Sequence, residues 1–169
     1  MSAEFLDDQQ RLADLYATDP EFAAAAPDQA VVDAVNTPGM RLPEIVRTVL
    51  TGYADRPALG SRAVELVTDP ATGRTRTELL GHFDTITFGQ LWERVRSVAN
   101  AWRADGVRPG DRVAILSATR YEWAIIDFAI LSIGAVTVPI YETSSPEQIK
   151  HVLNDSGSVL VFAETAAHA

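Results

Sequence analysis

A short loop in the last fifth of the sequence gathers the residues best suited to hold a ligand. It contains the hydroxyl side chains of Tyr141, Thr143, Ser144 and Ser145 beside Glu142, between a β-branched run and the expected start of a helix. Because the N–H groups at a helix N-terminus attract anions, hydroxyls gathered there can form an anion site. A simpler interpretation makes Ser145 only the residue that caps the helix. Tyr141, Thr143, Ser144 and Ser145 are therefore our candidates for cofactor binding.

Elsewhere the sequence shows no arrangement typical of catalysis or metal binding. It has neither the spaced glycines of a dinucleotide fingerprint, nor a Gly-rich phosphate loop, nor a Gly-x-Ser-x-Gly turn. His82, His151 and His168 stand at no spacing typical of metal ligands, and there is no cysteine. We therefore predict no catalytic residue and no metal site in this chain.

The elements that would position the candidate loop are three helices that begin with the same local pattern. In this capping box a hydroxyl stands three residues before Glu or Gln, and the two side chains satisfy free N–H groups. The pairs are Thr87 with Gln90, Thr119 with Glu122, and Ser145 with Gln148. Pro146 suits a first helical position, and Gly106 and Gly157 stand where the first and third helices should end. The middle helix, residues 120–133, is apolar on nearly all sides and should be buried on more than one.

Three short β-branched runs alternate with these helices. Residues 112–116, 135–140 and 158–163 each follow a turn, and the order strand, helix, strand, helix, strand predicts a parallel sheet. The first and third helices should each cover one side of it. Upstream, residues 63–67 and strands at 74–80 and 83–87 flank a turn cluster and predict an antiparallel hairpin.

The N-terminal part reads as a helical extension, with a weak apolar stripe at Leu12, Leu15 and Tyr16. A stronger stripe follows Pro43; its members are Ile45, Val46, Val49, Leu50 and Tyr53. We therefore predict an α/β fold, a parallel βαβαβ core with a β-hairpin and a helical N-terminal extension. The expected division is an extension at residues 1–56 and a partial α/β subdomain at residues 57–169.

Composition restricts the partners and the compartment. The 169 residues are 47% hydrophobic, which suffices for one core, and the net charge of −9 disfavours nucleic acid and anionic membranes. The absence of cysteine and of an apolar leader favours a cytoplasmic protein. Residues 123–140 form the longest apolar stretch, but Asp127, Gly134 and Pro139 interrupt it, so we expect no transmembrane segment.

Residues 85–164 resemble the N-terminal subdomain of the acyl-adenylating, AMP-forming superfamily, which includes acyl-CoA synthetases, peptide synthetase adenylation domains and luciferases. The matching motifs are Thr85-Ile86-Thr87-Phe88 with Leu91, then residues 107–114, then Gly134-Ala135-Val136 with Val138-Pro139. Residues 12–80 look like the adenylation domain of bacterial carboxylic acid reductases. Residues 117–145 look more like long-chain fatty acyl-CoA synthetases.

The resemblance implies a parent enzyme that activates a carboxylic acid, such as a fatty acid, with ATP and Mg²⁺ to an acyl-adenylate. The acyl group would then pass to CoA, or to a phosphopantetheine arm before reduction by NADPH to an aldehyde. In that superfamily the phosphate loop, the acyl pocket and a mobile lysine all follow the matched region. None is carried over to this sequence, so we expect an N-terminal fragment that is not catalytic alone.

Two alternatives stay open from the residues themselves. Three parallel strands leave at least one sheet edge unpaired, so the chain can be a stand-alone interaction module whose partner chain supplies the missing sheet. It can also be a small independent α/β domain that binds a nucleotide through residues 141–145.

Overall fold

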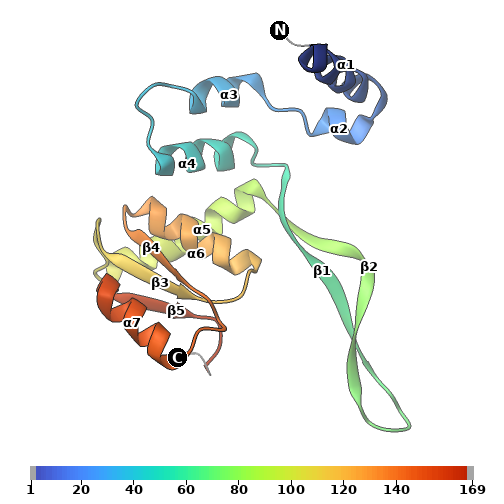
Figure 1. The fold of residues 1–169 in the computed structure, drawn as a ribbon. Helices are drawn as coiled ribbons and strands as arrows, with labels where there is room; N and C mark the ends of the chain where they lie inside the picture. Colours follow the sequence, from blue (N-terminus) through green and yellow to red (C-terminus); the bar gives the residue numbers. More distant parts are fainter. Residues whose placement is uncertain (1–2, 167–169) are drawn as a thin grey trace. The chain divides into compact units, whose positions relative to one another are not determined.

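The structure is a computed structural model that describes residues 3–166 (Figure 1). Contacts divide the chain into two compact units, Met1–Gly39 and Met40–Ala169. This boundary lies before the one expected at residue 56 because helix α4, Leu42–Gly52, packs its buried Leu50 into the core of the second unit. The predicted division into an extension at residues 1–56 and a subdomain at residues 57–169 stays a prediction.

In the described part of the first unit, from residue 3 on, there are three helices, as expected for a helical extension. They are α1 (Ala3–Thr18), α2 (Pro20–Ala24) and α3 (Gln29–Val35). Asp19 and Asp28 cap α2 and α3 by accepting backbone N–H groups of the first turns. The rings of Tyr16 and Phe22 lie 4.9 Å apart between centroids and join α1 to α2.

In the second unit, β1 (Pro57–Thr68) and β2 (Thr75–Thr87) form the predicted antiparallel hairpin (Figure 1). The separate strands expected at 74–80 and 83–87 were wrong, since β2 is continuous through this region. Register explains the difference: Arg62 pairs with Phe83 and Val64 with Leu79, so extra residues of β2 form a bulge. The bulge lies at residues 80–82 of β2, between the two expected strands.

The remaining elements form the α/β core. They are α5 (Phe88–Ala104), β3 (Arg112–Leu116), α6 (Tyr121–Ser132), β4 (Val136–Ile140), α7 (Pro146–Ser156) and β5 (Leu160–Ala163). The three strands are parallel, in the order β4-β3-β5. This confirms the predicted parallel βαβαβ core.

The sheet is covered by helices on both faces because the side chains of β3 alternate between them. Val113 and Ile115 pack with α5 and α6, whereas Ala114 and Leu116 face the apolar stripe of α7. Helix α6 is buried on more than one side, as expected; its buried residues are Ile125, Ile126, Ala129 and Ile130. Strand β3 is thus the centre of the fold, and the candidate loop, residues 141–145, follows the neighbouring strand β4.

Two of the three predicted capping boxes are confirmed. Thr87 with Gln90 and Ser145 with Gln148 make both reciprocal bonds. The box predicted at Thr119 was wrong. The N-cap residue of α6 is Arg120, and its side chain forms no capping hydrogen bond. The carboxylate of Glu122 binds the guanidinium of Arg120 instead.

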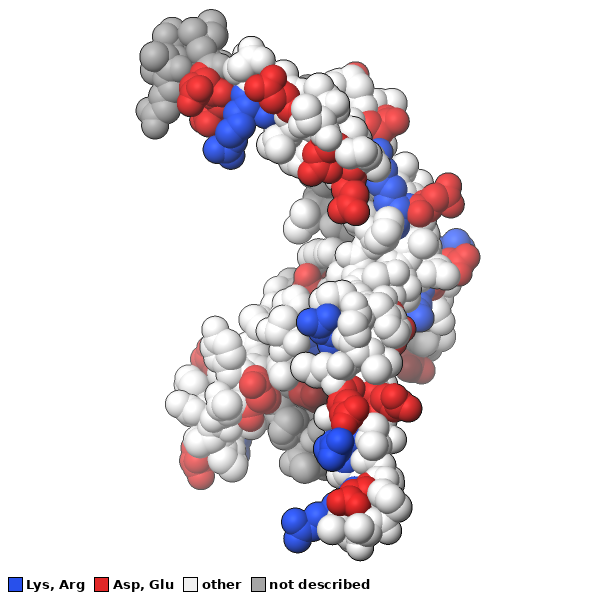
Figure 2. All heavy atoms as spheres, turned by 90° about the vertical axis from the view of Figure 1, so that its right-hand side faces the viewer, with Lys and Arg blue, Asp and Glu red and all other residues white. Residues whose placement is uncertain are grey.

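Charge is distributed without a dominant basic surface on the face shown in Figure 2. Among the described residues of that face, acidic and basic side chains are interspersed. Within residues 3–166, none of the helices combines the length and the apolar character that crossing a membrane requires.

Candidate functional site

The carboxyl ends of β3 and β4 meet at one edge of the sheet, where ligands of open parallel sheets usually bind. A hollow of about 450 Å³ lies at this edge. Its lining residues are Ser117, Thr119, Trp123, Pro139, Ile140, Tyr141 and Glu142. A second hollow, of about 480 Å³, lies beside the first turns of α7. Its lining residues are Glu142, Ser144, Pro146, Ile149, Lys150, Leu153 and Asn154.

The structure distributes the four candidate residues over different environments. Tyr141 stands at the rim of the first hollow with 80% of its surface exposed, and Ser144 lines the second. Thr143 lines neither hollow. Ser145 accepts the N–H of Gln148 at 3.3 Å and donates its hydroxyl to Glu147 at 2.9 Å. This hydroxyl therefore caps α7, and cofactor binding by the four residues stays a prediction.

The charge around this loop is mostly negative. The backbone N–H of Glu147 itself, and then the Ser145 hydroxyl, lower the pKa of the Glu147 carboxyl below its ordinary range. Glu142 lines both hollows, and Lys150 lines one of them. An anion bound here would need Lys150 to offset these carboxylates.

A test separates the capping role of Ser145 from ligand binding. We expect Ser145→Ala to lower the free energy of unfolding by about 0.5–2 kcal/mol, because an N–H group of the first turn of α7 loses its acceptor. Ser144→Ala is the matched control and should be near neutral, since no hydrogen bond is formed by the Ser144 hydroxyl within residues 3–166. Urea unfolding of both variants measures the difference. Equal losses would contradict the capping role.

A polar network at the ends of β3 and β5 was not anticipated from the sequence. The carboxylate of Glu164 accepts the N–H of Ala118 at 2.9 Å and a guanidinium N–H of Arg120 at 3.2 Å. Beside it, Ser117 is only 6% exposed. Arg120 also holds Glu122, and this hydrogen bond is the main reason why the pKa of the Glu122 carboxyl is lowered. The network fixes the segment that forms one wall of the first hollow.

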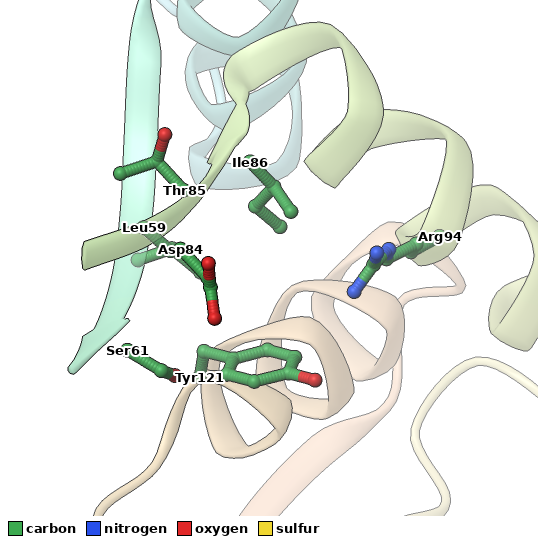
Figure 3. A pocket seen from close by; sticks show the side chains of 7 residues that line it. All are labelled: Leu59, Ser61, Asp84, Thr85, Ile86, Arg94 and Tyr121. Carbon is green, nitrogen blue, oxygen red and sulfur yellow. The ribbon is translucent and has the colours of Figure 1, made fainter. Parts of the chain in front are cut away.

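A third hollow, of about 260 Å³, lies between the base of the hairpin and the helices α5 and α6 (Figure 3). Its lining residues are Leu59 and Ser61 of β1, Asp84, Thr85 and Ile86 of β2, Arg94 of α5 and Tyr121 of α6. Figure 3 shows the Asp84 carboxylate and the Arg94 guanidinium directed into the same space, with the Tyr121 ring beside both. Sequence reasoning missed this hollow because its walls come from segments up to 62 residues apart, Leu59 and Tyr121.

Within residues 3–166, no group of three or more His, Asp or Glu side chains is placed so that it could hold a metal ion. What the arrangement offers is two hollows at the carboxyl edge of the sheet, with hydroxyls and an exposed tyrosine, and a third hollow with separated charges.

The AMP-binding enzyme family matches residues 48–169 of this chain. Among curated relatives, the carboxylic acid reductase of Mycobacterium marinum is 43% identical over 162 residues, which are 95% of this chain and 14% of that protein. The long-chain-fatty-acid–CoA ligase FadD15 of Mycobacterium bovis is 56% identical over 89 residues, 53% of this chain and 15% of that protein. The chain thus spans about 14% of the length of the first of these relatives.

Solved structures agree with these relatives. The adenylation domain of a carboxylate reductase from Mycobacterium chelonae matches 96% of this chain and 25% of its own, with a TM-score of 0.82 and 41% identity. The adenylation domain of the Segniliparus rugosus carboxylic acid reductase, in complex with AMP and a co-purified carboxylic acid, matches 92% of this chain and 25% of its own. Its TM-score is 0.82 at 32% identity. The fold is that of the N-terminal subdomain of adenylating enzymes, and the chain belongs to the AMP-binding enzyme family.

Proposed function

We propose that this chain is the N-terminal part of an enzyme that uses ATP and Mg²⁺ to convert a carboxylic acid into an acyl-adenylate. The observation that carries the proposal is the match to a carboxylate reductase adenylation domain over 96% of this chain at 41% identity. The Segniliparus rugosus domain was solved with AMP and a co-purified carboxylic acid, the two parts from which an acyl-adenylate is built.

The residues of this chain fit the role of a scaffold better than that of a triphosphate site. The hollows at the carboxyl edge are lined by Glu142 and by a single cation, Lys150. The four negative charges of ATP in such a place would be repelled by Glu142, with Lys150 as the one lining cation among residues 3–166 to offset them. The charge that develops on the α-phosphate when the carboxylate attacks it and pyrophosphate leaves must be offset by preorganised cations. We therefore assign the phosphate contacts of the parent enzyme to residues outside this chain.

Two second half-reactions agree with the relatives. In one, the acyl group passes to CoA, and the 56% identity with FadD15 favours it. In the other, a phosphopantetheine arm takes the acyl group and NADPH reduces it to an aldehyde. The reductase match extends over 95% of this chain and so includes the helical extension and the hairpin, whereas the ligase match covers 53%. We infer that the reductase type is the better supported.

A chimera tests the first half-reaction. This chain, joined to the remaining three quarters of the Mycobacterium chelonae adenylation domain, is expected to release pyrophosphate from ATP when Mg²⁺ and a carboxylic acid are added. The chain alone should release none, because the phosphate contacts are missing. Pyrophosphate release, measured across a panel of fatty and aromatic acids with an acid-free control, gives the answer.

Either of two outcomes would contradict the proposal. A chimera that folds, as judged by its circular dichroism, but releases pyrophosphate only at the acid-free rate would show that this chain is no working adenylation subdomain. Acid-dependent release by the chain alone would show that its own hollows hold the triphosphate.

A further inference from the structure

The hollow in Figure 3 holds two opposite charges that do not neutralise one another. The guanidinium carbon of Arg94 lies 5.9 Å from the centroid of the Tyr121 ring, and no ion pair joins Arg94 to a carboxylate among residues 3–166. The Asp84 carboxylate lies 3.8 Å from Nε2 of His82, and 78% of its side chain is exposed. A cation and an anion therefore face the same space and both are accessible to a ligand.

The wall between these charges is apolar. Leu59 and Ile86 are half-buried and pack against the main core, as does the ring of Tyr121. These three side chains come from the hairpin and from the start of α6, so the hollow is held by packed elements and not by a loop. Ser61 adds a hydroxyl on the hairpin side. The lining thus combines one positive end, one negative end and an apolar middle.

This charge pattern excludes the simplest ligands. A lone carboxylate or phosphate drawn to Arg94 would be repelled by Asp84, and a lone amine drawn to Asp84 would be repelled by Arg94. A molecule that carries both charges meets attraction at both ends. The volume of about 260 Å³ lies below the ~300–1,000 Å³ of pockets for drug-sized ligands, so the molecule should be small.

We propose that the hollow binds a compact zwitterion of the amino-acid type. Its carboxylate binds Arg94, its ammonium group binds Asp84, and its apolar side chain lies against Ile86 and Tyr121. The site is separate from the hollows at the carboxyl edge of the sheet, with which it shares no lining residue. Because both charges are exposed, each pair contributes little, and we expect a dissociation constant on the order of 1 mM that rises with salt.

The test is an NMR titration of the full chain with three probes of one side chain. L-leucine carries both charges, N-acetyl-L-leucine lacks the ammonium, and L-leucinamide lacks the carboxylate. We expect leucine to shift the backbone signals of Asp84, Arg94 and Tyr121 in a saturable way. Each blocked probe should bind about threefold more weakly or worse, the loss expected for one exposed ion pair.

Matched variants locate the site. Arg94→Gln and Asp84→Asn should each weaken leucine binding about threefold or more, because each removes one of the two charges. Arg96→Gln is the control: Arg96 is an exposed arginine on the same helix that does not line the hollow, so binding should be unchanged. Circular dichroism confirms that the variants fold, which is expected because Asp84 and Arg94 are exposed.

Every other outcome overturns the proposal. Equal binding of leucine and N-acetyl-leucine would mean an anion site, and equal binding of leucine and leucinamide would mean a cation site. No saturable shift up to about 50 mM leucine, far above the expected dissociation constant, would mean no site at all. Binding that Arg94→Gln and Asp84→Asn leave unchanged would place the ligand elsewhere.

Discussion

Replacing Ile130 by alanine is expected to lower the free energy of unfolding by about 2–5 kcal/mol. Ile130 is fully buried in α6, at the centre of the cluster that joins this helix to α5 and β3. The substitution removes three carbon atoms and leaves a cavity, because closely packed neighbours relax only partly. The loss is a large share of the stability of a domain of this size, typically 5–15 kcal/mol.

The measurement is urea unfolding followed by the fluorescence of the three tryptophans, all of which pack against this cluster: Trp92, Trp102 and Trp123. Val64→Ala is the control, because Val64 is 51% exposed on the hairpin and its loss should cost well under 1 kcal/mol. Similar midpoints for the two variants would show that α6 is not packed as the structure has it.

Replacing Glu164 by alanine is expected to cost about 1–3 kcal/mol and to loosen the segment between β3 and α6. The Glu164 side chain is only 20% exposed, and its carboxylate accepts the N–H of Ala118 at 2.9 Å. A partly buried N–H group that loses its acceptor carries the full desolvation penalty. Among residues 3–166, Arg120 would then keep Glu122 as its one ionic partner.

Hydrogen exchange distinguishes this role from a general loss of stability. Relative to the wild-type chain, Glu164→Ala should raise the exchange rate of the Ala118 amide more than the exchange rates of amides in the middle of β3. Glu142→Ala serves as the control, because Glu142 is exposed and forms no side-chain hydrogen bond within residues 3–166. If Ala118 and the middle of β3 change to the same extent, the network does not position this segment.

The comparisons place the candidate loop in an enzyme family without testing its residues. Tyr141 and Ser144 each line a hollow at the carboxyl edge, as a parallel sheet predicts. The Ser145 hydroxyl is engaged by Gln148 and Glu147. The sequence alone could locate this loop, because the end of a strand and the start of a helix are both recognisable from local patterns.

The sequence by itself determined the features that depend on neighbours within a few residues. The capping boxes at Thr87 and Ser145, the burial of α6 and the parallel strands all follow from local hydrogen bonding and hydrophobic periodicity. The family motifs share this property, because each lies in a single stretch of chain.

Only the tertiary structure decided the features that join distant segments. Glu164 meets Ala118 across 46 residues, and this contact helps to make Arg120, not Thr119, the N-cap residue of α6. The hollow between Asp84, Arg94 and Tyr121 likewise needs the hairpin and two helices. Such contacts depend on how strands and helices pack, and no spacing within one segment of the sequence records that packing.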